Sequence, residues 1–145
     1  MPHYKLDTGS LTAAILQLQE SLQYHDSNEY KADKKLNLLL RAAAIQAFEF
    51  TYELSWKMLK RYLEMNSADP HEIETMSFNT LIRTGCEQGL LLSDVVKWKE
   101  FRHNRSITSH TYDHQKAAEV FSSIPMFLKE AKYLLEQLNK RADES

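Results

Sequence analysis

Apolar residues recur every three or four positions along most of the chain, and this spacing predicts helices. A first stripe, formed by Leu11, Ile15, Leu18 and Leu22, predicts a helix over about residues 10–25. A second pattern predicts a helix over residues 33–65, with apolar positions on more than one face. These positions are Ile45, Ala47, Phe48, Phe50, Tyr52, Leu54, Trp56, Met58, Leu59 and Leu63. A helix with so much apolar surface is expected to contact several neighbours or a second subunit.

Capping and turn residues divide the middle of the chain. Residues 66–70 are expected to form a loop. Ser77 suits the N-cap of a third helix, and Gly89 suits the residue that follows its C-cap. A fourth helix is expected to begin at Ser93-Asp94. It should weaken over residues 106–109, because hydroxyl and β-branched side chains compete with helical structure.

The last helix is expected to follow Asp113, with Pro125 kinking or interrupting it. Its predicted buried seam consists of Ala117, Phe121, Ile124, Leu128, Ala131, Leu135 and Leu138. Residues 141–145 are expected to be a frayed tail. Together the elements predict one all-α domain over residues 1–145, ordered from about 10 to 140. The expected architecture is an antiparallel, up-and-down four-helix bundle with an additional short helix.

Composition changes this picture little. Three Gly and three Pro among 145 residues favour few, long elements. The formal net charge of −2 does not by itself indicate nucleic-acid binding. One cysteine, Cys86, allows no internal disulfide, and the N-terminus has no apolar leader, so a cytoplasmic location is expected. No stretch approaches the ~20 apolar residues of a membrane span, so no membrane partner is expected.

The pattern also predicts a core and a contact surface. The expected core residues are Trp56, Leu59, Trp98, Phe121 and Leu128. Since one short bundle cannot cover the apolar surface of the 33–65 helix, we expect a homodimer. Phe50 and Leu54 are the expected interface residues.

Basic residues gather in the fourth helix. Lys97, Lys99, Arg102 and Arg105 accompany one acidic residue, Glu100, although the chain as a whole is mildly acidic. Trp98, Arg102 and Arg105 would share one helix face. Guanidinium groups bind phosphate through two parallel hydrogen bonds, so Arg102 and Arg105 are candidate phosphate-binding residues. The alternative is a solvated helix face.

Arg105, His110 and Tyr112 form a candidate site at the corner between the last two helices. They can converge only if the helix ends between Arg105 and His110, which the Ser-Ile-Thr-Ser insert permits. If they converge, we expect them to line one solvent-reachable cleft floored by the 33–65 helix, with Glu49 or Glu53 nearby. Arginine would neutralise a phosphate, histidine would move a proton and tyrosine would offer a hydroxyl. A hydrogen-bonded scaffold is the alternative interpretation.

Other candidates are weaker. Glu49 and Glu53 lie one helical turn apart and can act as paired carboxylates, or simply form a solvated stripe. The spacing of His103, His110 and His114 does not place three metal ligands on one face, so no metal site is expected. Cys86 is expected in the core rather than as a nucleophile. The absence of a glycine-rich phosphate loop argues against a nucleotidyltransferase catalytic subunit.

Two sequence blocks resemble a known family. The run Ile45-Gln-Ala-Phe-Glu-Phe-Thr-Tyr-Glu-Leu-Ser-Trp-Lys57, followed by Trp98…Arg105…Ser-His-Thr-Tyr112, is similar to the nucleotidyltransferase substrate-binding proteins of the HEPN group. The resemblance extends from about Leu11 to Leu138. It implies a helical-bundle homodimer that works with a separately encoded minimal nucleotidyltransferase. No cofactor is implied for this chain, since metal and nucleotide would come through the partner.

The resemblance also implies two functions. In the first, which the sequence favours, the chain is a non-catalytic subunit. It binds a nucleotide or other phosphorylated substrate through Arg102, Arg105, His110, Tyr112, Glu49 and Glu53. In the second, the chain is a metal-independent endoribonuclease toxin whose catalytic residues are Arg105 and His110. Related ribonucleases carry Arg-x4–6-His. In some of them the pattern extends to Arg-x4-His-x-Tyr, and the partner silences the toxin by attaching AMP to the tyrosine, here Tyr112.

One departure bears on the second function. Many HEPN motifs have Asn or another polar residue directly after the arginine, whereas this chain has Ser106 there and Asn104 before the arginine. Serine can still contact phosphate, but it does not offer the side-chain amide of asparagine. A bare structural bundle without a site is the third alternative.

Overall fold

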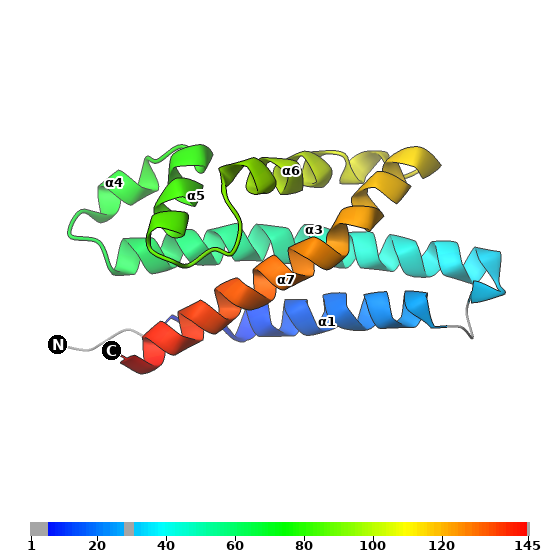
Figure 1. Ribbon diagram of the computed structural model, residues 1–145, viewed down its shortest axis with the longest axis horizontal. Coiled ribbons are helices and arrows are strands. Elements are labelled where there is room, and N and C mark those ends of the chain that lie inside the picture. Colours follow the sequence, from blue (N-terminus) through cyan, green and yellow to red (C-terminus); the bar gives the residue numbers. More distant parts are fainter. Residues whose placement is uncertain (1–5, 28–30, 145) are drawn as a thin grey trace.

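In the computed structural model, the described residues are 6–27 and 31–144, and they form a bundle of helices. With labels as in Figure 1, the bundle consists of α1 (Gly9–Asp26), α3 (Lys34–Met65), α6 (Val95–Ser106) and α7 (His114–Glu144). Successive members run in opposite directions, and α1 packs along α3 (Figure 1). This confirms the predicted antiparallel, up-and-down four-helix bundle. None of the described helices is long and apolar enough to cross a membrane.

Local capping explains where these helices begin. The side chains of Asp33, Ser77 and Asp94 accept hydrogen bonds from the backbone N–H groups of Leu36, Thr80 and Lys97. Each bond satisfies one N–H that has no partner within the helix. The starts predicted near Asp33 and at Ser77 and Asp94 are therefore confirmed.

Between α3 and α6 the chain forms two shorter helices, α4 (Pro70–Glu74) and α5 (Phe78–Glu87). Residues 66–70 were expected to be a loop and α4 was not expected, because five residues are too few to show a periodic pattern. The predicted end of α5 is confirmed. Gly89 has φ +75°, and the N–H groups of Gly89 and Leu90 bond to the carbonyls of Cys86 and Gly85. This closes α5 with the Schellman arrangement that glycine favours.

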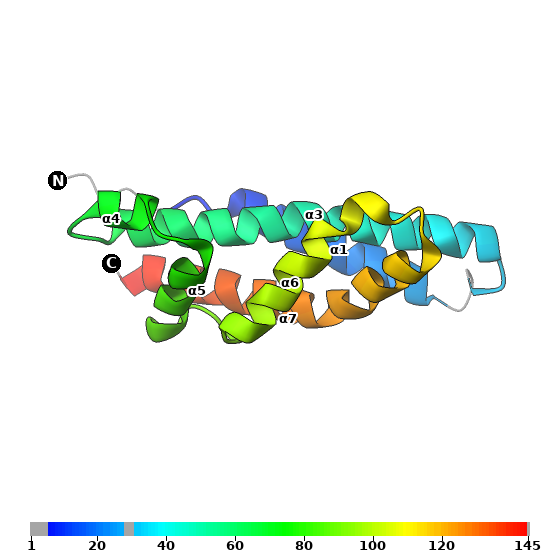
Figure 2. The same cartoon turned by 90° about the horizontal axis from the view of Figure 1, so that it is seen from above.

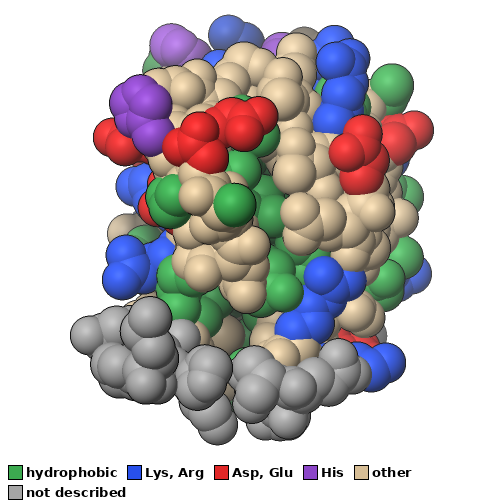
Figure 3. Space-filling view, turned by 90° about the vertical axis from the view of Figure 1, so that its left-hand side faces the viewer, with side chains coloured by type: hydrophobic (Ala, Val, Ile, Leu, Met, Phe, Trp, Pro, Cys, Tyr) green, Lys and Arg blue, Asp and Glu red, His purple; other side chains and the backbone are tan. Residues whose placement is uncertain are grey.

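Long α3 is the centre of the bundle. It contacts α1, α4, α5, α6, α7 and the 3-10 turn η1 (Thr108–His110). The view from above shows α6 and α7 on the same side of α3 (Figure 2). The many neighbours explain why its apolar residues are not confined to one stripe. At the end that carries α4 and α5, acidic, basic and histidine side chains are interspersed rather than gathered in one patch (Figure 3).

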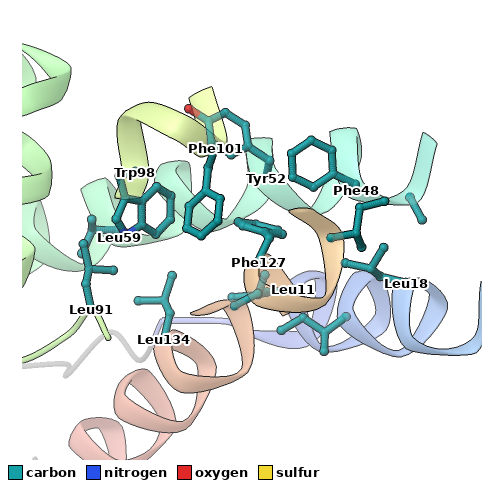
Figure 4. Close-up of a cluster of buried hydrophobic side chains, with 14 of the residues drawn as sticks. Leu11, Leu18, Phe48, Tyr52, Leu59, Leu91, Trp98, Phe101, Phe127 and Leu134 are labelled. Carbon is teal, nitrogen blue, oxygen red and sulfur yellow. The ribbon is translucent and has the colours of Figure 1, made fainter. Parts of the chain in front are cut away.

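Aromatic rings fill the middle of the core (Figure 4). Phe127 of α7 packs against Phe48, Phe101 and Trp98, at centroid distances of 5.1, 5.2 and 6.2 Å. Leu59 and Trp98 are fully buried as expected. Trp56, Phe121 and Leu128 were expected in the core but are only half-buried at its edge.

The buried seam of α7 differs from the predicted one. Its fully or nearly fully buried residues are Ala117, Val120, Ile124, Phe127, Glu130, Ala131, Leu134 and Leu138. Two apolar stripes share residues 117, 124, 131 and 138, and periodicity cannot choose between them. The aromatic cluster selects the stripe that contains Phe127.

The end of α7 also differs from expectation. The helix continues through Pro125 and reaches Glu144, instead of fraying from residue 141. Arg141 donates a hydrogen bond to the Gln88 carbonyl beyond α5, which ties this last turn to the rest of the fold. Ser145 lies outside the described residues.

Candidate functional site

The predicted break between the last two helices is present. Helix α6 ends at Ser106, η1 spans Thr108–His110, and Asp113 accepts bonds from the N–H groups of Gln115 and Lys116 at the start of α7. The Thr108 hydroxyl donates to the Arg105 carbonyl at 2.8 Å. This is the competition between hydroxyl and backbone that the Ser-Ile-Thr-Ser insert predicts.

Arg105 lies between α6 and α3. Its Nη2 is 3.2 Å from Glu49 Oε1, and its Nε is 3.3 Å from Glu53 Oε1. The Nε–Glu53 pair lacks the alignment of a hydrogen bond, so it is a charge contact. Nη1 donates to Thr108 Oγ1 at 3.2 Å. The structure thus brings together three of the predicted site residues, Glu49, Glu53 and Arg105.

The two carboxylates hold Arg105 without burying it. The Arg105 side chain is 31% exposed, and those of Glu49 and Glu53 are 41% and 33% exposed. Ion pairs in such exposed positions contribute little to stability. A phosphate that reaches Arg105 can therefore replace a carboxylate at modest cost.

His110 and Tyr112 lie at the outer side of the corner. Both are exposed, Tyr112 by 81%, and their rings meet edge to face at a centroid distance of 6.1 Å. Arg105 contacts Glu49, Glu53 and Thr108, whereas the His110 ring contacts Tyr112. The two parts of the predicted site therefore have different contact residues.

His110 is distinct among the histidines. Within the described residues no hydrogen bond or ion pair engages its imidazole, whereas each of the other described histidines has a polar side chain beside it. These pairs are His25 with Asp26, His71 with Glu74, His103 with Glu119 and His114 with Arg41. An unengaged, exposed imidazole is available to exchange a proton with a ligand. Because His103 and His114 have separate partners, they do not join His110 in one cluster.

A cavity of about 510 Å³ opens beside Arg105, between α3, α5 and α6. Its lining residues are Tyr52, Glu53, Trp56, Lys60, Met76, Phe78, Leu81, Arg102, Arg105 and Ser106. A cleft floored by the 33–65 helix was expected next to Arg105. His110 and Tyr112, which were expected to share it, are not among its lining residues.

Arg102, three residues before Arg105 on α6, also lines this cavity. Its guanidinium is 4.8 Å from the centroid of the Phe78 ring. Sequence reasoning identified Arg102 and Glu53 but missed Phe78, Lys60 and the aromatic role of Trp56. No sequence signal distinguished these three residues from ordinary packing or solvated positions.

Cys86 has the environment of a packing residue. Its thiol donates to the Ser93 carbonyl at 3.2 Å, and burial raises its pKa, with nearby Glu130 adding to the rise. A raised pKa lowers the fraction of reactive thiolate. Among the described residues, no cluster of three His, Cys, Asp or Glu side chains is placed to hold a metal ion.

Comparison with known proteins finds relatives that match most of the chain. The chain is 40% identical over 139 residues to a Haemophilus influenzae protein named "Probable ribonuclease HepT", and the match covers 94% of each chain. The solved structure of HI0074 from H. influenzae superposes with a TM-score of 0.85. It is 39% identical, and the match covers 92% of this chain and 99% of that one. HI0074 is described as revealing the fold of a substrate binding domain of a nucleotidyltransferase.

A second solved structure, of a protein from Thermus thermophilus, has a TM-score of 0.68 and 28% identity, covering 88% of this chain and 98% of that one. Residues 6–140 match the family described as "Nucleotidyltransferase substrate binding protein like". The chain therefore belongs to this family of nucleotidyltransferase substrate-binding proteins.

Proposed function

We propose that this chain is a metal-independent endoribonuclease whose reactive corner is formed by Arg105 and His110. The observation that carries the proposal is the His110 imidazole, which is exposed and unengaged five residues after an arginine and beside an exposed tyrosine. The relative named as a probable ribonuclease supports the same choice. It reverses the order that the sequence favoured, in which a non-catalytic subunit came first.

The chemistry needs groups that this corner offers. The 2′-OH of RNA attacks the adjacent phosphorus, a cyclic 2′,3′-phosphate forms, and the 5′-oxygen leaves. One group must take the proton of the 2′-OH and another must protonate the leaving oxygen. His110 performs one of these transfers, and Arg105 stabilises the charge that develops on the crowded phosphate.

A homodimer would supply the second proton-transfer group as His110 of a second copy. Phe50 is 58% exposed on α3 and Leu54 is half-buried, so Phe50 remains a candidate contact between copies. Sedimentation of the purified protein at micromolar concentration should show a dimer, and a monomer there would contradict this part of the proposal.

The partner in this proposal is a separately encoded minimal nucleotidyltransferase, and the pair works in the cytoplasm. The partner would transfer AMP from ATP to the Tyr112 hydroxyl and release pyrophosphate, which silences the ribonuclease. Metal and ATP come with the partner, and this chain carries no cofactor of its own. The 81% exposure of Tyr112 supports access by a second protein.

The decisive test compares two histidine variants. His110→Ala should lower cleavage of a labelled RNA in EDTA by at least about 100-fold, the usual contribution of acid–base catalysis. His114→Ala, which removes an exposed histidine four residues away, should cleave like the wild type. Equal cleavage by His110→Ala and the wild type would refute the ribonuclease proposal.

A non-catalytic nucleotide-binding subunit is the second candidate. Two observations favour it: the ion pairs of Arg105 with Glu49 and Glu53, and the cavity beside Arg105. In that case the wild type binds nucleotides without cleaving RNA. Arg105→Ala then weakens this binding, and added salt partly mimics the substitution.

A further inference from the structure

The cavity beside Arg105 has a chemical character that RNA cleavage alone does not use. We propose that it binds the nucleobase of a nucleotide whose phosphate lies at Arg105. The inference rests on the proposed function, because this nucleotide is part of the RNA held at that corner or a free nucleotide of the same chemistry.

The aromatic walls of the cavity suit a flat ring. Trp56 and Phe78 stand nearly perpendicular, with an interplanar angle of 83° and a centroid distance of 6.3 Å. Arg102 covers Phe78 and presents its own planar guanidinium. Unpaired bases stack on aromatic rings and on arginine planes, so these walls offer the surfaces that a base uses.

The charges of the lining suit a phosphate ester. Lys60, Arg102 and Arg105 line the cavity against one carboxylate, that of Glu53. The cavity is therefore locally cationic in a chain with a formal net charge of −2. Another cavity, of about 550 Å³ between α6 and α7, makes a useful contrast. Its lining includes Lys99 together with Glu100 and Glu119, and no Phe, Tyr or Trp.

Tyr52 adds a polar group to the aromatic lining of the cavity. The residue is 3% exposed, and Figure 4 shows its hydroxyl directed toward α6. Burial raises the pKa of this hydroxyl, so it remains a neutral donor at physiological pH. Since Tyr52 lines the cavity, its hydroxyl can donate a hydrogen bond to the edge of a base.

The size of the cavity agrees with this ligand. A volume of about 510 Å³ lies within the usual range for small-molecule sites and leaves room for a base with its ribose. Glu53 accepts from the Trp56 indole N–H at 3.2 Å through Oε2. This bond fixes the orientation of the indole before the base arrives.

The test measures binding of AMP, GMP, CMP, UMP and ribose 5-phosphate by calorimetry. We expect at least one nucleotide to bind about tenfold or more tightly than ribose 5-phosphate, since each stacked base adds an increment of that order. Equal affinity for all five compounds would show binding of phosphate alone and would overturn the inference.

Three variants locate the contribution of the base. We expect weaker nucleotide binding from each of Phe78→Leu, Arg102→Gln and Tyr52→Phe. Binding of ribose 5-phosphate should stay nearly unchanged in Phe78→Leu and Tyr52→Phe. In Arg102→Gln it should change only because a positive charge is lost. Arg83→Gln removes an exposed arginine of α5 outside the cavity and should bind like the wild type. Tyr52→Phe is the sharpest variant. A purely structural hydroxyl predicts a lower melting temperature with unchanged binding, whereas the inference predicts weaker binding without a lower melting temperature.

A short RNA, tested with the His110→Ala protein to prevent cleavage, distinguishes the two sources of the nucleotide. One outcome is that the RNA binds, that Arg102→Gln weakens RNA binding, and that free nucleotides do not bind at millimolar concentration. The base in the cavity then belongs to an RNA strand. If none of the three cavity variants changes nucleotide or RNA binding, the inference is wrong even where His110 proves essential for cleavage. Nucleotide binding that persists in a protein with no ribonuclease activity would contradict the proposed function alone.

Discussion

The two ends of α6 are held in opposite ways. At its start, the fully buried carboxylate of Glu130 accepts hydrogen bonds from the N–H groups of Leu92 and Ser93 at 2.7 and 2.9 Å, and Trp98 is fully buried. At its end, Arg105 is held by two half-exposed carboxylates, and His110 and Tyr112 face solvent. The firmly held start of α6 thus positions the other end of the helix, where a ligand can replace the contacts of Arg105.

The largest expected effect tests the buried end. Trp98→Ala should lower the free energy of unfolding by about 3–5 kcal/mol, because it leaves a cavity in the aromatic cluster. Trp56→Ala, at the half-buried edge, should cost clearly less. Chemical denaturation of both variants checks the order, and equal losses would show that the two tryptophans are not distinguished by burial.

Glu130 should give the next effect. Glu130→Ala leaves two backbone N–H groups without their acceptor, and we expect a loss of about 2–4 kcal/mol in the free energy of unfolding. RNA cleavage at a temperature where the variant is folded should fall as well, because the start of α6 is then less firmly placed. A variant as stable as the wild type would contradict a structural role for this carboxylate.

The pH dependence of stability also tests the structural role of Glu130. Burial raises the pKa of Glu130, while hydrogen bonds from Ser93 and Leu92 oppose the rise. The folded state therefore holds this proton to higher pH than the unfolded state. Its contribution to stability is present at low pH and is lost as pH rises from the ordinary carboxyl pKa to the raised one. Glu130→Gln should remove this dependence in denaturation curves measured across that interval.

The exposed end should respond in binding rather than in stability. Glu49→Gln removes one carboxylate from Arg105, so RNA should bind a few-fold more tightly while stability changes by no more than about 0.5 kcal/mol. Calorimetry at fixed salt measures the first and thermal unfolding the second. Glu64→Gln, on the same helix but away from Arg105, is the control, and weaker RNA binding by Glu49→Gln would contradict an exchangeable contact.

The smallest structural effect belongs to Tyr112→Phe. The ring is largely exposed, so loss of the hydroxyl should leave the melting temperature and RNA cleavage nearly unchanged. Co-expression of a minimal nucleotidyltransferase should then fail to relieve growth arrest by this variant, although it relieves arrest by the wild type. Relief of both would place the silencing modification elsewhere.

The sequence predicted those parts of the fold that depend on local chemistry. The caps at Asp33, Ser77 and Asp94, the glycine at position 89 and the break after Arg105 act within a few residues and are readable from them. Glu130 was missed because a carboxylate in an amphipathic helix is usually solvated. Its burial depends on two N–H groups nearly forty residues away.

The candidate site was predictable residue by residue, but not as an arrangement. The sequence identified Arg105, Glu49 and Glu53, yet their contact spans about fifty residues and depends on how α6 crosses α3. The cavity residues Lys60 and Phe78 have no distinctive spacing, and they gain meaning only where α5 packs beside α3 and α6.

The connection between α5 and α6 is held by hydrogen bonds to residues in the second half of α7. Glu130 binds Leu92 and Ser93, the Tyr133 hydroxyl donates to the Gly89 carbonyl, and Arg141 donates to the Gln88 carbonyl. These contacts join residues that are 37 to 53 positions apart in the sequence. The placement of the segment that carries Arg105 and His110 therefore depends on the second half of α7, so a substitution there would reach the corner without touching it.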